Sequence, residues 1–268
     1  MRIDAHTQNA FGCTSGAWTI WSLSDGHVDL PASLLQDPDG GPQDTTSSGA
    51  MVRLSVNCFL IQHEGGDPTL IDCGAGGSWH DTMGHLGRAF AEAGLSPASL
   101  RTLLFTHAHS DHIHGLVSRA GGETFPNLTR LLIPEAAIAT FDAEAGLSRF
   151  RRLLTPIRDG DAVVPGVHAV ALPGHAAGHT GYRLDTGEET ILICGDIVHV
   201  PARQFARPSL TWAYDDDQAT ARTTRLRVLA DAAATGTWLA GAHLGRPGMG
   251  QVRRVGDAYG FDVAGQVR

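Results

Sequence analysis

The chain has 268 residues, of which 42% are hydrophobic and 18% are charged, and its formal net charge is −8. The length suits one large α/β domain, so we expect a single domain over residues 1–268. The acidic balance disfavours binding to nucleic acid through phosphates, and no run approaches the roughly 18 apolar residues of a membrane span. No signal peptide is recognisable, so we expect a cytoplasmic protein whose four cysteines are free thiols.

The first half of the chain alternates predicted strands and helices. Content of β-branched and other apolar residues predicts strands over 18–23, 53–62, 101–106 and 129–134. The stretch 68–77 is predicted to be a short apolar strand that ends in an acid and a Gly-rich turn. The segment 30–50 is rich in Pro, Gly, Asp and Ser, which predicts a long loop that serves either as a lid or as a plain excursion. Apolar residues at helical spacing predict a helix over 80–94.

The second half contains two strands that run into Gly-containing polar loops, within 167–184 and 190–200. A helix is predicted over 215–236, with acidic residues at its N-terminus that complement the helix dipole and an apolar stripe that includes Leu226. The last predicted strand lies within 237–245 and again ends in a histidine.

One arrangement therefore occurs four times: an apolar strand is followed directly by His or Asp. These segments are 106–112, 172–179, 193–199 and 240–243. Side chains at strand ends are held rigidly and can meet at one edge of a sheet. We therefore expect the four segments to form one polar site.

The first of these segments has the densest group of metal-binding side chains, in the sequence T-H-A-H-S-D-H from Thr106 to His112. Side chains two residues apart point the same way in extended backbone, so His107 and His109 can chelate one cation. Asp111 and His112 follow where the chain turns towards a helix and can face a second point nearby. Imidazoles with a carboxylate suit Zn²⁺ and similar transition metals.

This H-x-H-x-D-H pattern resembles the signature of the metallo-β-lactamase-fold hydrolases. Four further motifs resemble those of the family and occur in its order: IDCGAGG (71–77), PGHAAGHT (173–180), CGDIVH (194–199) and GAHLG (241–245). The stretches LSDGHVDLP, DCGAGG and GDIVHVPARQFARP resemble the branch that holds methyl parathion hydrolase and the N-acyl homoserine lactonases. The resemblance implies a four-layer αβ/βα sandwich, in which two mixed β-sheets have flanking helices and the metals lie at one edge.

The resemblance also implies the ligands of two divalent metal ions per chain. The first ion would be bound by His107, His109 and His175, the second by Asp111, His112 and His243, and Asp196 would bridge them. Zn²⁺ is the expected metal, with Mn, Fe and Co as alternatives. Asp111 and His199 are the expected catalytic residues; lactonases of this type can have Tyr at the position of His199, and the methyl parathion hydrolase branch has His.

Three further polar residues lie close to these motifs. In PGHAAGHT the family's ligand is the first histidine, so His179 is expected to orient a ligand or to pack under the loop. Asp72 is expected to be structural or to support a ligand. His114 is expected to face away from the metals.

Two divalent cations that share a water lower its pKa towards neutrality, and the resulting metal-bridging hydroxide can attack a carbonyl carbon or a phosphorus. The sequence thus predicts a hydrolase of a small-molecule lactone, ester or organophosphate, and the resemblance suggests a homodimer. Two alternatives stay open: a mononuclear iron sulfur-transfer dioxygenase of the same fold, and a non-catalytic metal-binding domain. Phe205, Trp212 and Tyr214 are candidates for the walls of a substrate pocket or for the core.

Overall fold

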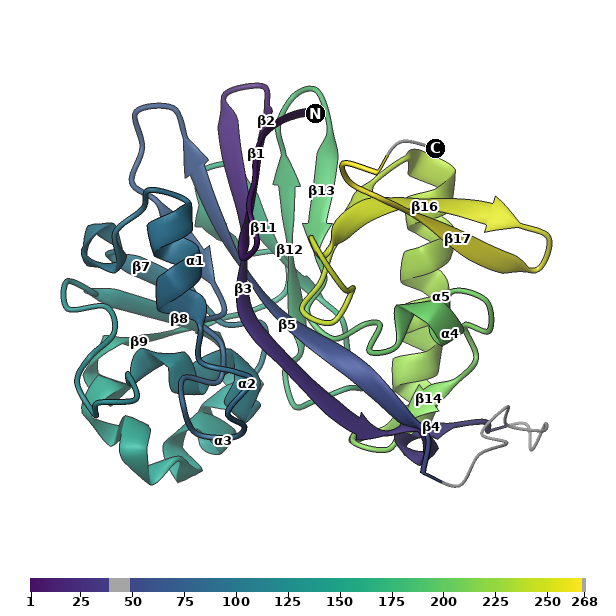
Figure 1. The fold of residues 1–268 in the computed structure, drawn as a ribbon, viewed down its shortest axis with the longest axis horizontal. Coiled ribbons are helices and arrows are strands. Elements are labelled where there is room, and N and C mark those ends of the chain that lie inside the picture. Colours follow the sequence, from purple (N-terminus) through teal and green to yellow (C-terminus); the bar gives the residue numbers. More distant parts are fainter. Residues whose placement is uncertain (39–48, 267–268) are drawn as a thin grey trace.

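The computed structural model describes residues 1–38 and 49–266, and these form two large mixed β-sheets that face each other, with helices on the outer faces (Figure 1). The first sheet has the strand order β1-β2-β3-β5-β6-β7-β8-β9, and the second has the order β10-β11-β12-β13-β15-β16-β17. A two-stranded sheet joins β14 and β4. The layers are those of the four-layer αβ/βα sandwich, as the sequence predicts.

The strands of the first sheet are β1 (Arg2–His6), β2 (Ala10–Ser15), β3 (Trp18–Pro31), β5 (Met51–His63), β6 (Thr69–Ile71), β7 (Thr102–Leu104), β8 (Arg130–Pro134) and β9 (Leu154–Ile157). Those of the second sheet are β10 (Ala162–Val164), β11 (Val167–Ala171), β12 (Thr180–Asp185), β13 (Thr190–Ile193), β15 (Trp238–Ala240), β16 (Met249–Val255) and β17 (Ala258–Val263). The small sheet pairs β4 (Leu35–Gln36) with β14 (Thr211–Trp212).

The α-helices are α1 (Leu86–Glu92), α2 (Ser110–Ile113), α3 (Ile138–Ala143), α4 (Pro201–Gln204) and α5 (Gln218–Thr235). Short 3₁₀ helices cover η1 (Ala32–Leu34), η2 (Pro97–Ser99), η3 (His114–Leu116), η4 (Glu135–Ala137) and η5 (Ala145–Leu153). In Figure 1, α1, α2 and α3 lie on the side of the first sheet, and α4 and α5 lie on the side of the second. No helix within the described residues combines the length and apolar character that crossing a membrane requires.

The alternation of side chains along each strand explains why the layers stack. In β7, Leu103 packs on the outer face with Phe90 of α1, whereas Leu104 faces the second sheet in the cluster that contains Tyr182. On the far side, Leu229 of α5 packs against the outer face of the second sheet. Strands that are covered on both faces, such as β7 and β13, are therefore largely apolar.

Parallel pairing brings strand ends to the same edge. β6, β7 and β8 are parallel neighbours in the first sheet, and β13 and β15 are parallel neighbours in the second. Their carboxyl ends therefore point the same way within each sheet. The polar segments that the sequence places after β7, β13 and β15 start from these ends.

Two predicted helices differ in detail from the structure. The helix predicted over 80–94 covers only Leu86–Glu92, because the buried carboxylate of Asp25 accepts hydrogen bonds from the backbone N–H groups of Gly84 and Leu86 and holds the preceding residues as turns. In α5, Leu226 is 36% exposed, and the buried face instead includes Arg225 and Val228. Arg225 takes this place because its guanidinium reaches backbone oxygens below the helix.

The predicted loop over 30–50 is only partly a loop: residues 32–36 form η1 and β4, and β4 pairs with β14. Residues 39–48 of that segment lie outside the described part of the chain, so its role as a lid or an excursion stays a prediction. The four cysteines are free and buried, as expected. That residues 1–268 form a single domain also stays a prediction.

Candidate metal centre

The polar segments predicted to meet do lie together at one edge of the two sheets. His107 and His109 follow the end of β7, and Asp111 lies in the short α2. His175 lies in the loop between β11 and β12, while the other two residues, Asp196 and His243, follow β13 and β15. All except His109 are buried, although each is a polar side chain.

These residues form groups whose potential ligand atoms lie within 4.8 Å of one another. Two of the groups are His107–His109–His175 and Asp111–His112–His243. A third joins Asp196 to His107 and His112, and a fourth joins it to His199 and His243. The structure therefore brings all seven predicted ligands into one cluster.

The carboxylate of Asp196 lies between the two groups. Its Oδ1 is 3.3 Å from His112 Nε2. Its Oδ2 is 3.3 Å from His175 Nε2 and 2.9 Å from His243 Nε2. His107 Nε2 lies 3.9 Å from the same Oδ2. One carboxylate thus faces both halves of the cluster, which is the position a bridging ligand needs.

Several buried ligand atoms lack hydrogen bonds. His107 Nε2, His112 Nε2 and Asp196 Oδ1 have no hydrogen-bond partner among the described residues. A buried polar atom without a partner costs roughly 1–3 kcal/mol, so native proteins rarely leave several together. Imidazole nitrogens and carboxylate oxygens directed at a common point are a donor set that divalent transition metals satisfy. The cluster therefore fits a metal centre.

The opposite nitrogen of four histidines is fixed by an oxygen. His112 Nδ1 donates to Asp72 Oδ2 at 2.8 Å, and His175 Nδ1 donates to Asp215 Oδ1 at 2.8 Å. His243 Nδ1 donates to the backbone oxygen of Ser55 at 2.6 Å. These bonds hold a proton on Nδ1 and direct Nε2 at the centre, as in metal-binding histidines generally.

The fourth histidine is fixed through Thr106. The Thr106 hydroxyl lies 3.0 Å from His107 Nδ1 and donates to Asp72 Oδ2 at 2.8 Å. Asp72 Oδ1 also accepts the backbone N–H of Thr106 at 2.8 Å. Asp72 holds this place with a φ of +56°, a backbone conformation that Asp tolerates better than most residues. The carboxylate expected to be structural thus orients His107 and His112 together.

Burial and neighbouring charge shift the pKa values in the cluster. Burial opposes the charged form of His175, but its hydrogen bonds to Asp196 and Asp215 raise its pKa to about 9. Burial lowers the pKa of His107 well below its usual range, and neighbouring His112 adds to the effect. The pKa of Asp196 is held well below its usual range because the surrounding histidines, His243 first, outweigh its burial. Asp196 is therefore a carboxylate anion.

His179 supports the centre from behind. Its Nδ1 donates to the Leu172 backbone oxygen at 2.9 Å, and its Nε2 accepts the backbone N–H of Asp196 at 3.1 Å. Gly195 has a φ of +52°, and a Cβ there would lie 2.5 Å from His179 Nε2. His179 Nε2 thus holds the backbone that carries Asp196, while Nδ1 ties the ring to Leu172.

The sequence pattern predicts Asp215 only as one of three acids at a helix N-terminus and does not single it out as a functional residue. In the structure the three acids differ: Asp217 caps α5 by accepting the Thr220 N–H, whereas Asp215 is buried and accepts the His175 ring N–H. The sequence signal that could have separated them is the large apolar Trp212, whose side chain is buried and whose backbone N–H donates to Asp215 in the structure.

His199 lies flat between two rings. It stacks on Trp212 with ring centroids 5.1 Å apart and on His243 at 5.4 Å. His199 Nε2 is 3.5 Å from Asp196 Oδ2, and neither ring nitrogen has a hydrogen-bond partner in the described part of the chain. Burial lowers the pKa of His199 to about 4. Among the predicted wall residues, Phe205 and Trp212 are buried, whereas Tyr214 is 55% exposed.

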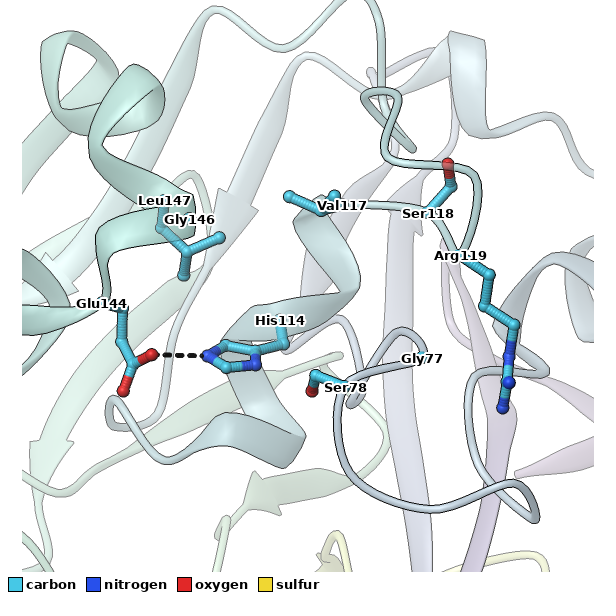
Figure 2. A pocket seen from close by; sticks show the side chains of 9 residues that line it. All are labelled: Gly77, Ser78, His114, Val117, Ser118, Arg119, Glu144, Gly146 and Leu147. Atoms are coloured by element: carbon cyan, nitrogen blue, oxygen red, sulfur yellow. Dashed lines mark hydrogen bonds and ion pairs between the residues drawn. The ribbon is translucent and has the colours of Figure 1, made fainter.

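His114 lies outside the cluster. Its Nε2 is 2.9 Å from Glu144 Oε2, and Figure 2 shows the ring directed at Glu144 in a surface pocket. Ser78 and Arg119 also line this pocket, which has a volume of about 370 Å³. The expectation that His114 faces away from the metal ligands agrees with this placement.

The family follows from the whole of this arrangement. A model of the metallo-beta-lactamase superfamily matches residues 51–243. The protein belongs to that superfamily, and the fold predicted from the motifs is confirmed.

Individual relatives point to hydrolases within it. The N-acyl homoserine lactonase of Bacillus thuringiensis is 25% identical over 185 residues, which cover 59% of this chain and 69% of the lactonase. The structure of AbOPH, a hydrolase in the beta lactamase superfamily, aligns with a TM-score of 0.86 at 25% identity and covers 96% of this chain and 98% of AbOPH. AidC, a dizinc quorum-quenching lactonase in complex with the product N-hexanoyl-L-homoserine, aligns with a TM-score of 0.82 at 19% identity, covering 97% and 99% of the two chains. That last likeness shows the shared fold.

Proposed function

We propose that this protein is a hydrolase dependent on two divalent metal ions, with a small lactone, ester or organophosphate triester as its substrate. The observation that carries the proposal is the pair of ligand groups on either side of the Asp196 carboxylate, with buried ring nitrogens that have no other described partner. The lactonase and hydrolase relatives support the reaction class. The acidic chain, with a net charge of −8, disfavours a nucleic acid substrate.

We assign the ligands as the family resemblance implies. The first ion would be held by His107, His109 and His175, the second by Asp111, His112 and His243, with Asp196 between them. The contact of His175 Nε2 with His109 Nδ1 at 3.1 Å supports the first set, because two ring nitrogens this close converge on one point. Zn²⁺ is the expected metal, since this set combines imidazoles with carboxylates and lacks thiolates.

A bound pair of such cations would supply a hydroxide nucleophile near neutral pH and Lewis-acid polarisation of the substrate oxygen. The chain's own contribution is to hold and orient. Asp111 is buried, with its Oδ2 3.6 Å from both His112 Nε2 and His243 Nε2. We assign it a second role, in which a carboxylate oxygen carries a proton to the leaving group.

His199 is the second residue to which we assign a catalytic role. Its ring is held flat between Trp212 and His243, and its two nitrogens have no described partner, so one of them can bind a substrate oxygen beside Asp196. A fixed donor at that place would stabilise charge that develops on the substrate during hydrolysis. The stacking holds the ring in place before the substrate binds.

The proposal is tested with a small panel of substrates and fully metal-loaded protein. The panel contains N-acyl homoserine lactones, simple γ-lactones, aryl esters and a paraoxon-like triester. We expect metal-dependent turnover of at least one class, abolished by a chelator and restored by Zn²⁺. No turnover of any class by protein that carries two ions would contradict the proposal.

A further inference from the structure

We propose that Asp215 and Arg225 are positioning residues for the metal centre: a buried Arg–Asp–His chain fixes His175 and ties the loop of His175 to the loop of Asp196. This inference rests on the proposed function, because it takes His175 and Asp196 as metal ligands. It adds two residues that no ligand motif contains.

The first step is the contact between Asp215 and His175. Asp215 is 7% exposed, and its Oδ1 accepts the His175 Nδ1–H at 2.8 Å while its Oδ2 accepts the backbone N–H of Trp212 at 3.0 Å. A carboxylate held from a second side in this way cannot rotate freely. It therefore fixes the direction of the ring and points His175 Nε2 at Asp196.

The second step is the guanidinium of Arg225, which is 1% exposed within α5. Its Nη2 lies 3.7 Å from Asp215 Oδ2, and its Nε donates to the Ile197 backbone oxygen at 2.7 Å. Ile197 directly follows Asp196, so one rigid planar group contacts both the partner of His175 and the backbone next to the proposed bridging carboxylate. Nη1 also donates to the backbone oxygen of Leu210.

The third step is the close packing of the His175 loop on the start of α5. Thr224 Oγ1 donates to the Pro173 backbone oxygen at 2.7 Å, and the backbone N–H of Asp217 donates to the Gly174 oxygen at 2.9 Å. Gly174 has a φ of +121°, and a Cβ there would lie 2.1 Å from the Ala221 nitrogen. The loop therefore approaches the helix as closely as glycine alone permits.

Together these contacts make α5 a support for one side of the centre. Burying the charge of an arginine or an aspartate without an ionic partner costs free energy of folding. Because Arg225 and Asp215 are buried beside each other, each charge offsets part of the cost of burying the other. The chain of contacts reaches His175 and the backbone oxygen of Ile197, next to Asp196, and none of its contacts is with Asp111 or His112. Loss of these contacts should consequently lower the affinity for one metal ion more than the affinity for the other.

The test is an equilibrium competition for Zn²⁺ against a chromogenic chelator, which resolves the two binding affinities without reference to activity. We expect Asp215→Asn to weaken one of the two affinities by about 10–100-fold, the range seen when a partner of a ligating histidine is lost, and to leave the other nearly unchanged. Arg225→Lys keeps the positive charge without the planar fork and should weaken the same ion by a smaller factor.

Asp216→Asn is the matched control, because it removes the same charge from the exposed neighbouring residue and should leave both affinities as in the wild type. If Asp215→Asn and Asp216→Asn bound Zn²⁺ with equal affinities, the inference would be overturned. The proposed function would still stand in that case, provided that the wild type binds two ions. An equal fall of both affinities, with a lower Tm of the metal-free Asp215→Asn protein, would assign a general structural role instead and also overturn it. A wild-type protein that binds no Zn²⁺ would remove the proposed function itself.

Discussion

The predicted ligands around Asp196 come from a compact side and a dispersed side of the chain, which are built in different ways, and each assigned ion takes ligands from both. On one side, His107, His109, Asp111 and His112 come from a single loop and the short helix α2. Their orienting groups, Asp72 and Thr106, lie at the ends of the neighbouring strands β6 and β7. On the other side, the predicted ligands His175 and His243 follow different strands of the second sheet.

The orienting groups of this second side come from further away. Asp215 lies before α5, and the Ser55 oxygen that accepts the His243 Nδ1–H belongs to β5 of the first sheet. The ligands of the compact side are oriented by residues at the ends of adjacent strands, whereas those of the dispersed side are oriented by residues of distant elements. The predictions that follow test this difference, beginning with the residue that the two sides share.

Asp196→Asn should have the largest effect, because the Asp196 carboxylate faces both ligand groups. We expect loss of both ions and of nearly all hydrolysis, a greater loss than the roughly 10–100-fold cost of removing one orienting partner. Elemental analysis and turnover of the best panel substrate measure it. His109→Ala should behave similarly, and full metal content with full activity in either variant would show that the ligand assignment is wrong.

His199→Phe should separate catalysis from metal binding. Phenylalanine keeps the stack on Trp212 but removes both ring nitrogens. We expect unchanged metal content and a fall in kcat of about 10²-fold, the lower end of the cost of losing one oxyanion donor. Steady-state kinetics on metal-loaded protein measures the change. Loss of metal from this variant would instead make His199 a ligand.

Asp72→Asn tests the compact side alone. Asparagine tolerates the φ of +56° but leaves buried donors from Thr106 and His112 without a full set of acceptors. We expect about 10–100-fold weaker binding of the ion assigned to Asp111, His112 and His243, and a free energy of unfolding lower by about 1–3 kcal/mol. Chelator competition and urea unfolding measure the two effects. If Asp72→Asn weakened only the ion assigned to His107, His109 and His175, the direct contact of Asp72 with His112 would not be what orients this side.

The smallest effect is expected for Glu144→Gln, which breaks the part-exposed pair with His114 outside the cluster. Exposed ion pairs contribute about 0–1 kcal/mol, so stability should change little and metal content not at all. Thermal unfolding and elemental analysis provide the check. A loss of metal here would extend the centre beyond the seven assigned ligands.

The sequence predicted the parts of the fold and site that depend on local pattern. The apolar run before His107 predicts both the strand β7 and the point at which ligands begin, because a strand end presents the next side chains at a sheet edge. The resemblance of the motifs to those of the superfamily predicts the layers, which are confirmed. It also implies His175 rather than His179 as a ligand, which stays a prediction; both nitrogens of His179 are hydrogen-bonded elsewhere.

The parts that escaped prediction depend on contacts between distant residues. The apolar periodicity predicts a helix over 80–94 that is longer than the one observed. The residues near 86 do not show that the Leu86 N–H donates to Asp25, which lies some sixty residues earlier. Asp215 precedes α5 and Arg225 lies within it, and charged residues at such positions are usually exposed. Their burial follows from packing of the His175 loop on α5. The ligand motifs are local in the sequence, whereas the residues that orient the dispersed ligands lie far from them in the sequence.

The most direct test is the metal content of the purified wild-type protein, measured beside Asp196→Asn, together with metal-dependent turnover of the substrate panel. We expect two zinc-like ions per chain in the wild type, neither in the variant, and hydrolysis that requires both ions. A single iron per chain, with oxygen consumed and no hydrolysis, would contradict the dinuclear hydrolase and favour a dioxygenase of the same fold.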